Sequence, residues 1–289
     1  MVNIVLIFLV FYITSSNFAV SLLLFAILVP QILLSFIGGV VADIGNRKTI
    51  LVLGNLLRAG VLIILFFNYK SLGVIYLVTF LISAVTQFYV PAESPLIPSL
   101  VKRDKLVAAN SIFGIGLFGA VLFGYVLAGP AISIFGRSFI FLILAGIFIA
   151  AGFFAFLIPG KKIVIKSRSK EPNGKFSIRD EFMHSFSLLR KTRSVGDAFF
   201  LLIFSQVVIF ILATLIPGYA RSILQIPAEE LSLILFGPAA LGMVTSALLI
   251  GSVFNKSSKD KLMNVGIFLS GITLVLLPAT SRIFSQSIN

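Results

Sequence analysis

The chain has 289 residues, of which 58% are hydrophobic and 11% are charged. This composition excludes an ordinary soluble domain and indicates a protein that crosses a membrane several times. The absence of cysteine excludes disulfides and thiolate metal sites, and the single histidine, His184, excludes a metal site of several histidines. The net charge of +13 lies in loops between apolar segments, so it indicates membrane topology rather than nucleic-acid binding.

Nine apolar segments follow one another along the chain. They cover residues 2–13, 17–42, 49–67, 73–92, 107–134, 138–159, 198–217, 231–254 and 262–281. A helix rises about 1.5 Å per residue, so roughly twenty residues cross a hydrocarbon core of about 30 Å. The first segment is too short for this. It is either a short or re-entrant helix or, as we favour, the end of a first helix whose start is missing from this chain.

Lysine and arginine are distributed unequally between alternate loops. Eighteen lie in the loops at 43–48, 101–106, 160–195 and 255–261, whereas four lie in the other set, namely Lys70, Arg137, Arg221 and Arg282. The positive-inside rule therefore predicts that the first set is cytoplasmic in a multi-pass protein of the cell (plasma) membrane.

One long polar segment divides the chain into residues 1–159, 160–195 and 196–289. The breaker Glu171-Pro-Asn-Gly174 indicates that the middle part is a linker. Within it, Phe182, Phe186 and Leu189 recur at helical spacing between basic residues. This pattern predicts an amphipathic helix on the cytoplasmic membrane surface, and a simple solvated linker is the alternative.

A short charged turn separates the second and third apolar segments. Its residues Gly39, Asp43, Arg47 and Lys48 resemble the loop between helices 2 and 3 of the major facilitator superfamily, although Ile44 stands where the family usually has arginine. The resemblance implies a cytoplasmic gate that holds the outward-open state. The alternative is a plain helix cap, with Asp43 at the start of the third helix, where the positive helix end favours an anion.

The resemblance continues into the fourth and fifth segments. The run from Pro91 to Asn110 is similar to the end of helix 4 and the start of helix 5 in drug and siderophore exporters of that superfamily, and Gly124, Gly129 and Pro130 follow their helix-5 motif. Tyr125 replaces the motif's proline and Ala128 replaces one of its glycines. Ordinary close packing of helices is the alternative role for the glycines.

The fold implied by this resemblance is an all-α bundle of the major facilitator type with about nine transmembrane segments. The first of these is partial. Six segments precede the linker and three follow it, so the second half is incomplete relative to a family pattern of six plus six.

Arg58 is the one charge well inside an apolar segment. An arginine at the bilayer centre costs roughly 2.5–3.5 kcal/mol on insertion scales, so Arg58 is expected to face the bundle interior. Three roles remain open: a structural or gating residue, a substrate contact, or a side chain that extends to the cytoplasmic face.

Other polar residues near the spans are candidates for the transport path. Glu93 is either a proton-coupling acid or a hydrated carboxylate at the membrane interface. Uncharged residues that either line a central substrate cavity or form interhelical hydrogen bonds are Gln87, Asn110, Tyr125 and Gln206.

These features predict a secondary active transporter rather than an enzyme, and no cofactor is expected. The expected partners are the lipid bilayer, a hydrophobic or amphiphilic small molecule that the protein exports by alternating access, and a coupling proton or cation. The alternative is a non-transporting truncated membrane remnant or a membrane interaction protein. The sequence does not indicate an oligomeric state.

Overall fold

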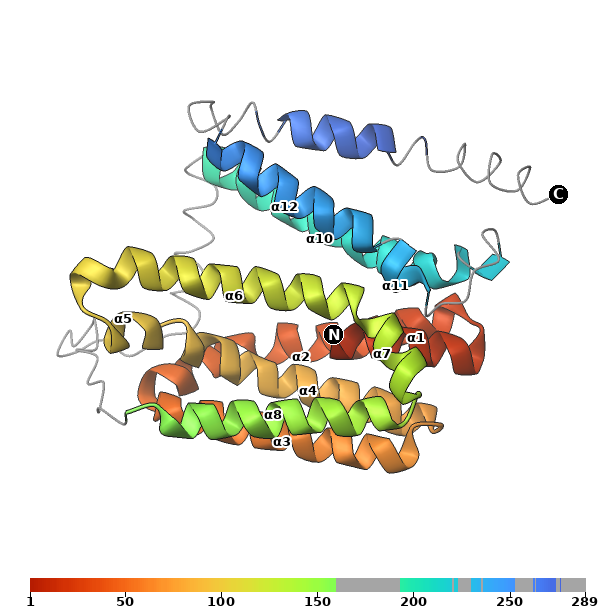
Figure 1. Ribbon diagram of the computed structural model, residues 1–289, viewed down its shortest axis with the longest axis horizontal. Helices are drawn as coiled ribbons and strands as arrows, with labels where there is room; N and C mark the ends of the chain where they lie inside the picture. The colour runs from red at the N-terminus through yellow and green to blue at the C-terminus, as the bar shows by residue number, and fades with distance from the viewer. Residues whose placement is uncertain are drawn as a thin grey trace.

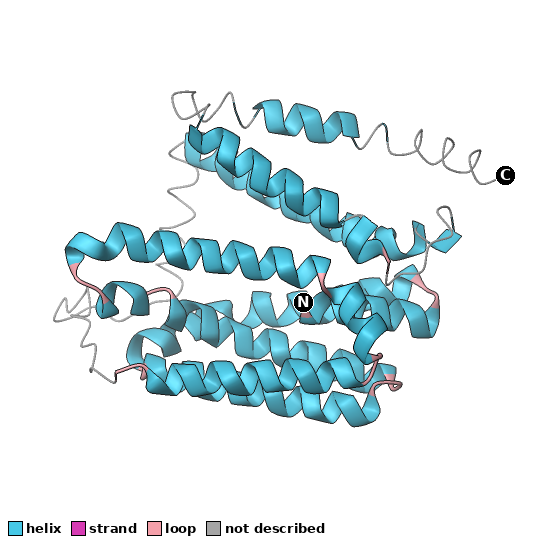
Figure 2. Cartoon of the chain, viewed as in Figure 1, coloured by secondary structure: helices cyan, strands magenta, loops and turns pink. Residues whose placement is uncertain are grey.

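The computed structural model describes residues 1–159, 193–219, 221–222, 230–234, 236–252, 262, 264–273 and 276. In chain order the helices are α1 (Val2–Thr14), α2 (Asn17–Ile44), α3 (Arg47–Asn68), α4 (Leu72–Glu93), α5 (Leu96–Leu100), the 3-10 turn η1 (Arg103–Lys105), α6 (Leu106–Val126), α7 (Ala128–Phe135), α8 (Phe139–Leu157), α10 (Arg193–Tyr219), α11 (Leu231–Ile234) and α12 (Phe236–Ser252). Among these described residues there is no strand (Figure 2). The expected all-α membrane fold is confirmed.

Six of the described helices are long and apolar enough to cross a membrane. They are α2, α3, α4, the Ala108–Val126 part of α6, α8 and the Phe199–Tyr219 part of α10. Two shorter apolar helices, α1 and Asn264–Thr273, add to them. The predicted linker and its amphipathic helix lie almost entirely outside the described residues, although α10 begins at Arg193, slightly before the predicted start of the last part of the chain.

The middle of helix α1 is buried. Eight consecutive residues, from Ile4 to Phe11, expose 9% or less of their surface. An apolar stripe is enough for a helix at a surface, whereas a helix that is apolar all round belongs in an interior. Accordingly α1 packs against α2, α4, α7 and α10. It ends at Ser15, which has a positive φ of 51°, and Ser16 then caps α2 by accepting a hydrogen bond from the Ala19 N–H at 3.4 Å.

Helix α4 packs against both α2 and α3, and α8 packs against α3. All four helices run roughly along the horizontal in the lower part of Figure 1. Two hydrogen bonds join α4 to the backbone of α2: Ser83 Oγ donates to the Ile27 carbonyl oxygen at 2.6 Å, and the Tyr76 hydroxyl donates to that of Ala19 at 3.2 Å. A group of buried apolar residues lies where the ends of α2, α4 and α8 and the short helix α5 meet α3: Ala42, Leu51, Ala92, Leu96 and Ala155.

The predicted fifth segment is two helices rather than one. α6 ends at Val126, Leu127 separates the two, and α7 begins at Ala128. Pro130 has no N–H, so the Val126 carbonyl loses its helical donor and the helix breaks there. Gly136 ends α7 with φ of 81°, a conformation that favours glycine. The later helices α11 and α12 pack against α6, while α10 packs against α2.

Candidate functional site

The charged turn begins on the last turn of α2, which contains Asp43 and ends at Ile44. Asn46 is the cap of α3, because its side-chain oxygen accepts a hydrogen bond from the Thr49 N–H at 3.4 Å. The predicted location of Asp43 at the start of the third helix is therefore wrong. Its carboxylate instead stands at the negative end of α2, which disfavours an anion.

Arg47 compensates for this placement. Its side chain is only 6% exposed, and its Nε donates to the Ala42 carbonyl oxygen at 3.2 Å. Its Nη2 is 3.5 Å from Asp43 Oδ1, while Asp43 itself is 76% exposed. A cation at the end of α2 satisfies a terminal carbonyl and opposes the helix dipole. The turn is thus anchored by Arg47, whereas the Asp43 side chain is exposed. Lys48 lies over the ring of Phe156 in α8, with its Nζ 4.8 Å from the ring centre.

The glycine that packs most closely is one residue before the predicted motif. Gly39 has no atom within 4 Å of the place where a Cβ would lie. Gly38 is buried, and a Cβ there would overlap the backbone carbonyl of Gln87 in α4. Pro91 follows Gln87 by four residues, so that carbonyl has no helical N–H partner. Pro91 in the sequence indicates that the Gln87 carbonyl is free. The sequence does not indicate that this carbonyl meets Gly38 of α2.

Arg58 lies near the middle of α3 and is 7% exposed. Its Nη2 donates to Thr86 Oγ1 of α4 at 3.1 Å, and this hydroxyl donates in turn to the Ile82 carbonyl oxygen at 2.7 Å. The guanidinium carbon is 4.3 Å from the ring centre of Tyr89 and 5.6 Å from that of Phe148 in α8. Arg58 therefore faces the α3–α4–α8 interface, where two aromatic rings cover a desolvated cation.

One buried donor in this interface, Arg58 Nε, lacks a hydrogen-bond partner among the described residues. The side chain of Asn55, which is 2% exposed, interacts with the hydroxyl of Tyr89. An unsatisfied buried donor costs about 1–3 kcal/mol, so Arg58 Nε requires an explanation. Glu93 is half-buried at the end of α4, one turn beyond Tyr89, and interacts electrostatically with Arg58. The sequence had marked Arg58 and Glu93, whereas Asn55, Thr86 and Tyr89 were missed because ordinary polar and aromatic residues carry no distinguishing pattern.

Comparison with known proteins decides the family. The family model described as Major Facilitator Superfamily matches residues 1–288. The chain belongs to the major facilitator superfamily. It is similar to the "Uncharacterized MFS-type transporter YkuC" of Bacillus subtilis (strain 168), with 24% identity over 278 residues, which cover 87% of this chain and 60% of that protein. The chain thus spans about 60% of the length of this curated relative. No solved structure matches significantly.

In this member of the major facilitator superfamily, the four uncharged polar candidates lie on three helices, α4, α6 and α10. Gln87 donates to the Ser83 carbonyl oxygen of its own helix at 3.2 Å. Asn110 and Tyr125 are both exposed on α6, and fifteen residues of helix separate them by about 22 Å. Gln206 is exposed on α10. That these residues line one substrate cavity therefore stays a prediction, as does the alternative of interhelical hydrogen bonds.

The helix-5 motif of this superfamily chain lies at the α6–α7 junction. Gly124 and Gly129 are buried, and a Cβ at Gly124 would lie 2.8 Å from the backbone nitrogen of Met1. Pro130 is half-buried in the first turn of α7. The motif residues therefore allow close approach between α1 and the fifth segment, as small residues do in membrane helices.

Proposed function

We propose that the chain is part of a secondary active transporter that exports a hydrophobic or amphiphilic small molecule by alternating access. The observation that carries the proposal is the superfamily match over residues 1–288. The exporter-like subgroup is supported by Asn110, Gly124, Gly129 and Pro130, which follow its motifs. The apolar, phenylalanine-rich helices suit a lipophilic molecule better than a sugar.

The turn between α2 and α3 is the proposed cytoplasmic gate. Arg47 anchors the turn on the backbone of α2, so Asp43 extends from a fixed point with most of its surface exposed. A displayed carboxylate on a rigid turn is suited to pair reversibly with a cation or a helix N-terminus of the opposite half. Gate opening would then break this contact without melting the turn.

In this proposal, the interface around Arg58 links the protonation of a coupling acid to the movement of the helices. Glu93 and Arg58 interact electrostatically across α4 and α3, and Arg58 Nε has no hydrogen-bond partner among the described residues. Protonation of Glu93 would change the charge that Arg58 faces, and a local change of this kind biases the packing of α3 against α4 and α8. Glu93 is thus the proposed coupling acid, and Arg58 the proposed gating residue.

Transport is tested with the full chain reconstituted in liposomes. Uptake of the cationic dye rhodamine 6G and of the anionic probe NBD-dodecanoate is followed under an imposed proton gradient and, separately, a sodium gradient. We expect gradient-dependent movement that a protonophore abolishes, and a loss of proton coupling in Glu93→Gln with binding of the probe retained. If the probes move under neither gradient, the chain is better described as a non-transporting membrane protein.

A further inference from the structure

Arg58 uses only part of one edge of its guanidinium group. Its Nη2 donates to Thr86 Oγ1 at 3.1 Å, whereas the neighbouring Nε has no hydrogen-bond partner among the described residues. Nε and Nη2 lie on the same edge, and together they form a fork that matches the two oxygens of a carboxylate. The single hydroxyl oxygen of Thr86 occupies one arm of this fork. The edge is therefore better suited to a carboxylate than to the hydroxyl that it binds here.

Glu93 provides a carboxylate on the same side of α4 as Thr86. The two residues are seven positions apart, which is two helical turns or roughly 10 Å along the axis, so both side chains face α3. Glu93 interacts electrostatically with Arg58, but no ion pair joins these two described residues. Arg58 thus has two alternative partners on α4, and in this structure it is bonded to Thr86.

Tyr89 lies between these two partners on α4, and its ring centre is 4.3 Å from the guanidinium carbon. It also interacts electrostatically with Glu93, which follows it by one turn. The ring is fixed against α3 in two ways. Its hydroxyl interacts with the side chain of Asn55, which is buried, and a Cβ at Gly54 would lie 3.2 Å from the ring atom Cδ2. The ring therefore stands in the path of the guanidinium from Thr86 to Glu93.

Arg58 is the charged group that acts on Glu93 from a neighbouring helix. Helices α1, α2, α3 and α5 pack against α4, and the interaction of Glu93 with a charge on these helices is with Arg58. Asp43 and Arg47 pair with each other, and Lys48 lies over a ring of α8. An opposite charge favours the ionised form of a carboxyl group more strongly as the two approach. The position of the guanidinium therefore influences the pH at which Glu93 ionises.

We propose that Tyr89 is a positioning residue that holds Arg58 on Thr86 and apart from Glu93, an inference that rests on the proposed function of Glu93 as the coupling acid. Tyr89 thereby sets the pH at which Glu93 releases its proton to water. When Glu93 is ionised, the guanidinium turns from the hydroxyl to the carboxylate, and both arms of its fork are bonded. Because the ring stands in the way, this turn requires Tyr89 to move against α3.

The test follows the protonation of Glu93 by infrared spectroscopy of the purified full chain in nanodiscs of neutral phosphatidylcholine. The carboxylic acid C=O band is recorded over a pH series and assigned by its loss in Glu93→Gln. In Tyr89→Leu the midpoint is expected to fall by about one pH unit or more, because a cation close to a carboxyl group lowers its pKa by about 1–3 units. Tyr89→Phe keeps the ring and is expected to titrate like the parent chain. A fall of the same size in Tyr89→Phe would overturn the role of the ring.

Thr86→Val releases Arg58 without changing the ring, and it keeps the proposal testable if Tyr89→Leu does not fold. We expect its midpoint to fall as well. Its matched control is Thr79→Val, because the Thr79 hydroxyl bonds within α4 to Ile75 and should not affect Glu93. Unchanged midpoints in both Tyr89→Leu and Thr86→Val, or an equal fall in Thr79→Val, would overturn the proposal.

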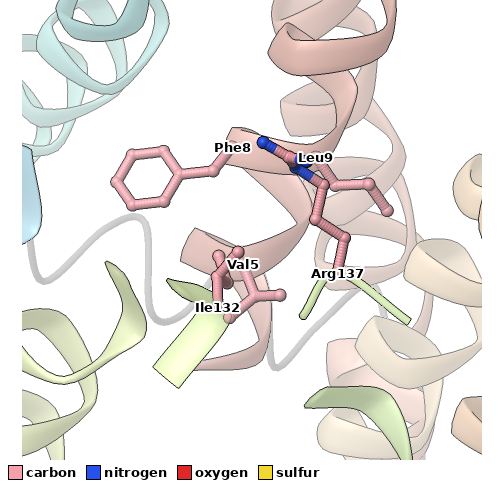
Figure 3. A pocket seen from close by; sticks show the side chains of 5 residues that line it. All are labelled: Val5, Phe8, Leu9, Ile132 and Arg137. Atoms are coloured by element: carbon pink, nitrogen blue, oxygen red, sulfur yellow. The ribbon is translucent and has the colours of Figure 1, made fainter. Parts of the chain in front are cut away.

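Tyr12→Leu is the matched control for the loss of a tyrosine ring. The Tyr12 ring centre is 3.5 Å from the guanidinium carbon of Arg137. Arg137 lies between α7 and α8 and extends along α1 toward Phe8 and Leu9, beside a cavity of about 10 Å³ (Figure 3). This is the end of α8 opposite to the one that packs near Glu93. Tyr12→Leu is therefore expected to leave the Glu93 midpoint unchanged, and a fall like that in Tyr89→Leu would contradict a local effect.

The titration requires no transport, so it separates this inference from the proposed function. Lower midpoints in Tyr89→Leu and Thr86→Val, in a chain that moves no probe, would support the role of Tyr89 and reject coupled transport. Transport with unchanged midpoints in both variants would reject the role of Tyr89 alone. Where the chain transports, the pH profile of Tyr89→Leu is expected to shift to lower pH by the same amount as its midpoint, and Tyr89→Phe is expected to restore the parent profile.

Discussion

Gly38 of α2 lies directly against the backbone carbonyl of Gln87 in α4, the carbonyl that Pro91 deprives of its helical donor. The missing side chain lets the two helices approach closely at a carbonyl that has no helical N–H partner. Contacts between Cα–H groups and carbonyl oxygens recur at such helix interfaces and contribute perhaps 0.5–1 kcal/mol each. Gly38 and Pro91 thus contribute to the same contact between α2 and α4.

Gly38→Ala is expected to lower the free energy of unfolding by about 1–3 kcal/mol, because the new methyl group would overlap Gln87 and force the helices apart. The measurement is loss of the monodisperse size-exclusion peak on heating in detergent. Gly39→Ala is the matched control, since its methyl group would meet nothing within 4 Å. Equal destabilisation by both substitutions would contradict the packing described here.

Arg47 and Asp43 are expected to have separable effects. Arg47→Ala removes a buried charged hydrogen bond to the end of α2 and should reduce stability by about 1.5–3 kcal/mol. Asp43→Asn affects an exposed pair worth about 0–1 kcal/mol, so the protein should keep its stability and membrane insertion while transport falls. Thermal stability and dye transport are measured on the same preparations. Unchanged transport in Asp43→Asn would remove the gate role.

Arg58 and Tyr89 are expected to be energetically coupled. A double-mutant cycle of Arg58→Met and Tyr89→Leu, measured by reversible unfolding in mixed micelles, should give a coupling energy of about 0.5–2 kcal/mol for a desolvated cation over a ring. The control cycle uses Lys70 and Tyr69, where the cation is exposed and 5.8 Å from the ring centre, and should give less than about 0.5 kcal/mol. Similar values in both cycles would mean that burial adds nothing to the Arg58 contact.

Ser83 is expected to contribute to the contact between α2 and α4. Ser83→Ala removes its hydrogen bond to Ile27 and should lower stability by about 0.6 kcal/mol, with an upper value near 1.7. Thr79→Val serves as the control, because the hydroxyl of this equally buried residue bonds only within its own helix, to Ile75. A smaller loss for Ser83→Ala than for Thr79→Val would argue against an interhelical role.

The predicted topology is testable without background labelling because the chain has no cysteine. Single cysteines at positions 169 and 222, replacing Ser169 and Ser222, should react with a membrane-impermeant maleimide from opposite sides of the membrane. Labelling in intact cells is compared with labelling after permeabilisation. Reaction of both positions from one side would refute the assignment of the loop at 160–195 to the cytoplasm.

Local features of the sequence were sufficient to locate most helices. The predicted segments 73–92 and 138–159 differ by one or two residues at each end from α4 and α8. The reason is that an apolar segment of membrane-spanning length has to satisfy its backbone internally, and only a helix does so within one segment. The break near Leu127 was missed although Pro130 was visible, because a proline inside a membrane helix is often tolerated.

By itself, the sequence determined the fold class, because this depends on the length of the apolar segments. It also determined the family resemblance, which depends on the order of the motifs, and the burial of Arg58, which follows from the energetic cost of a charge in lipid. Only the tertiary structure decided that Gly38 rather than Gly39 is the contact glycine, that Asn46 rather than Asp43 caps α3, and that Thr86, 28 residues away, accepts the hydrogen bond from Arg58. In a soluble helix, an apolar stripe identifies the packed face. In a membrane, lipid and neighbouring helices are equally apolar, so the face that packs depends on contacts between helices that no single segment contains.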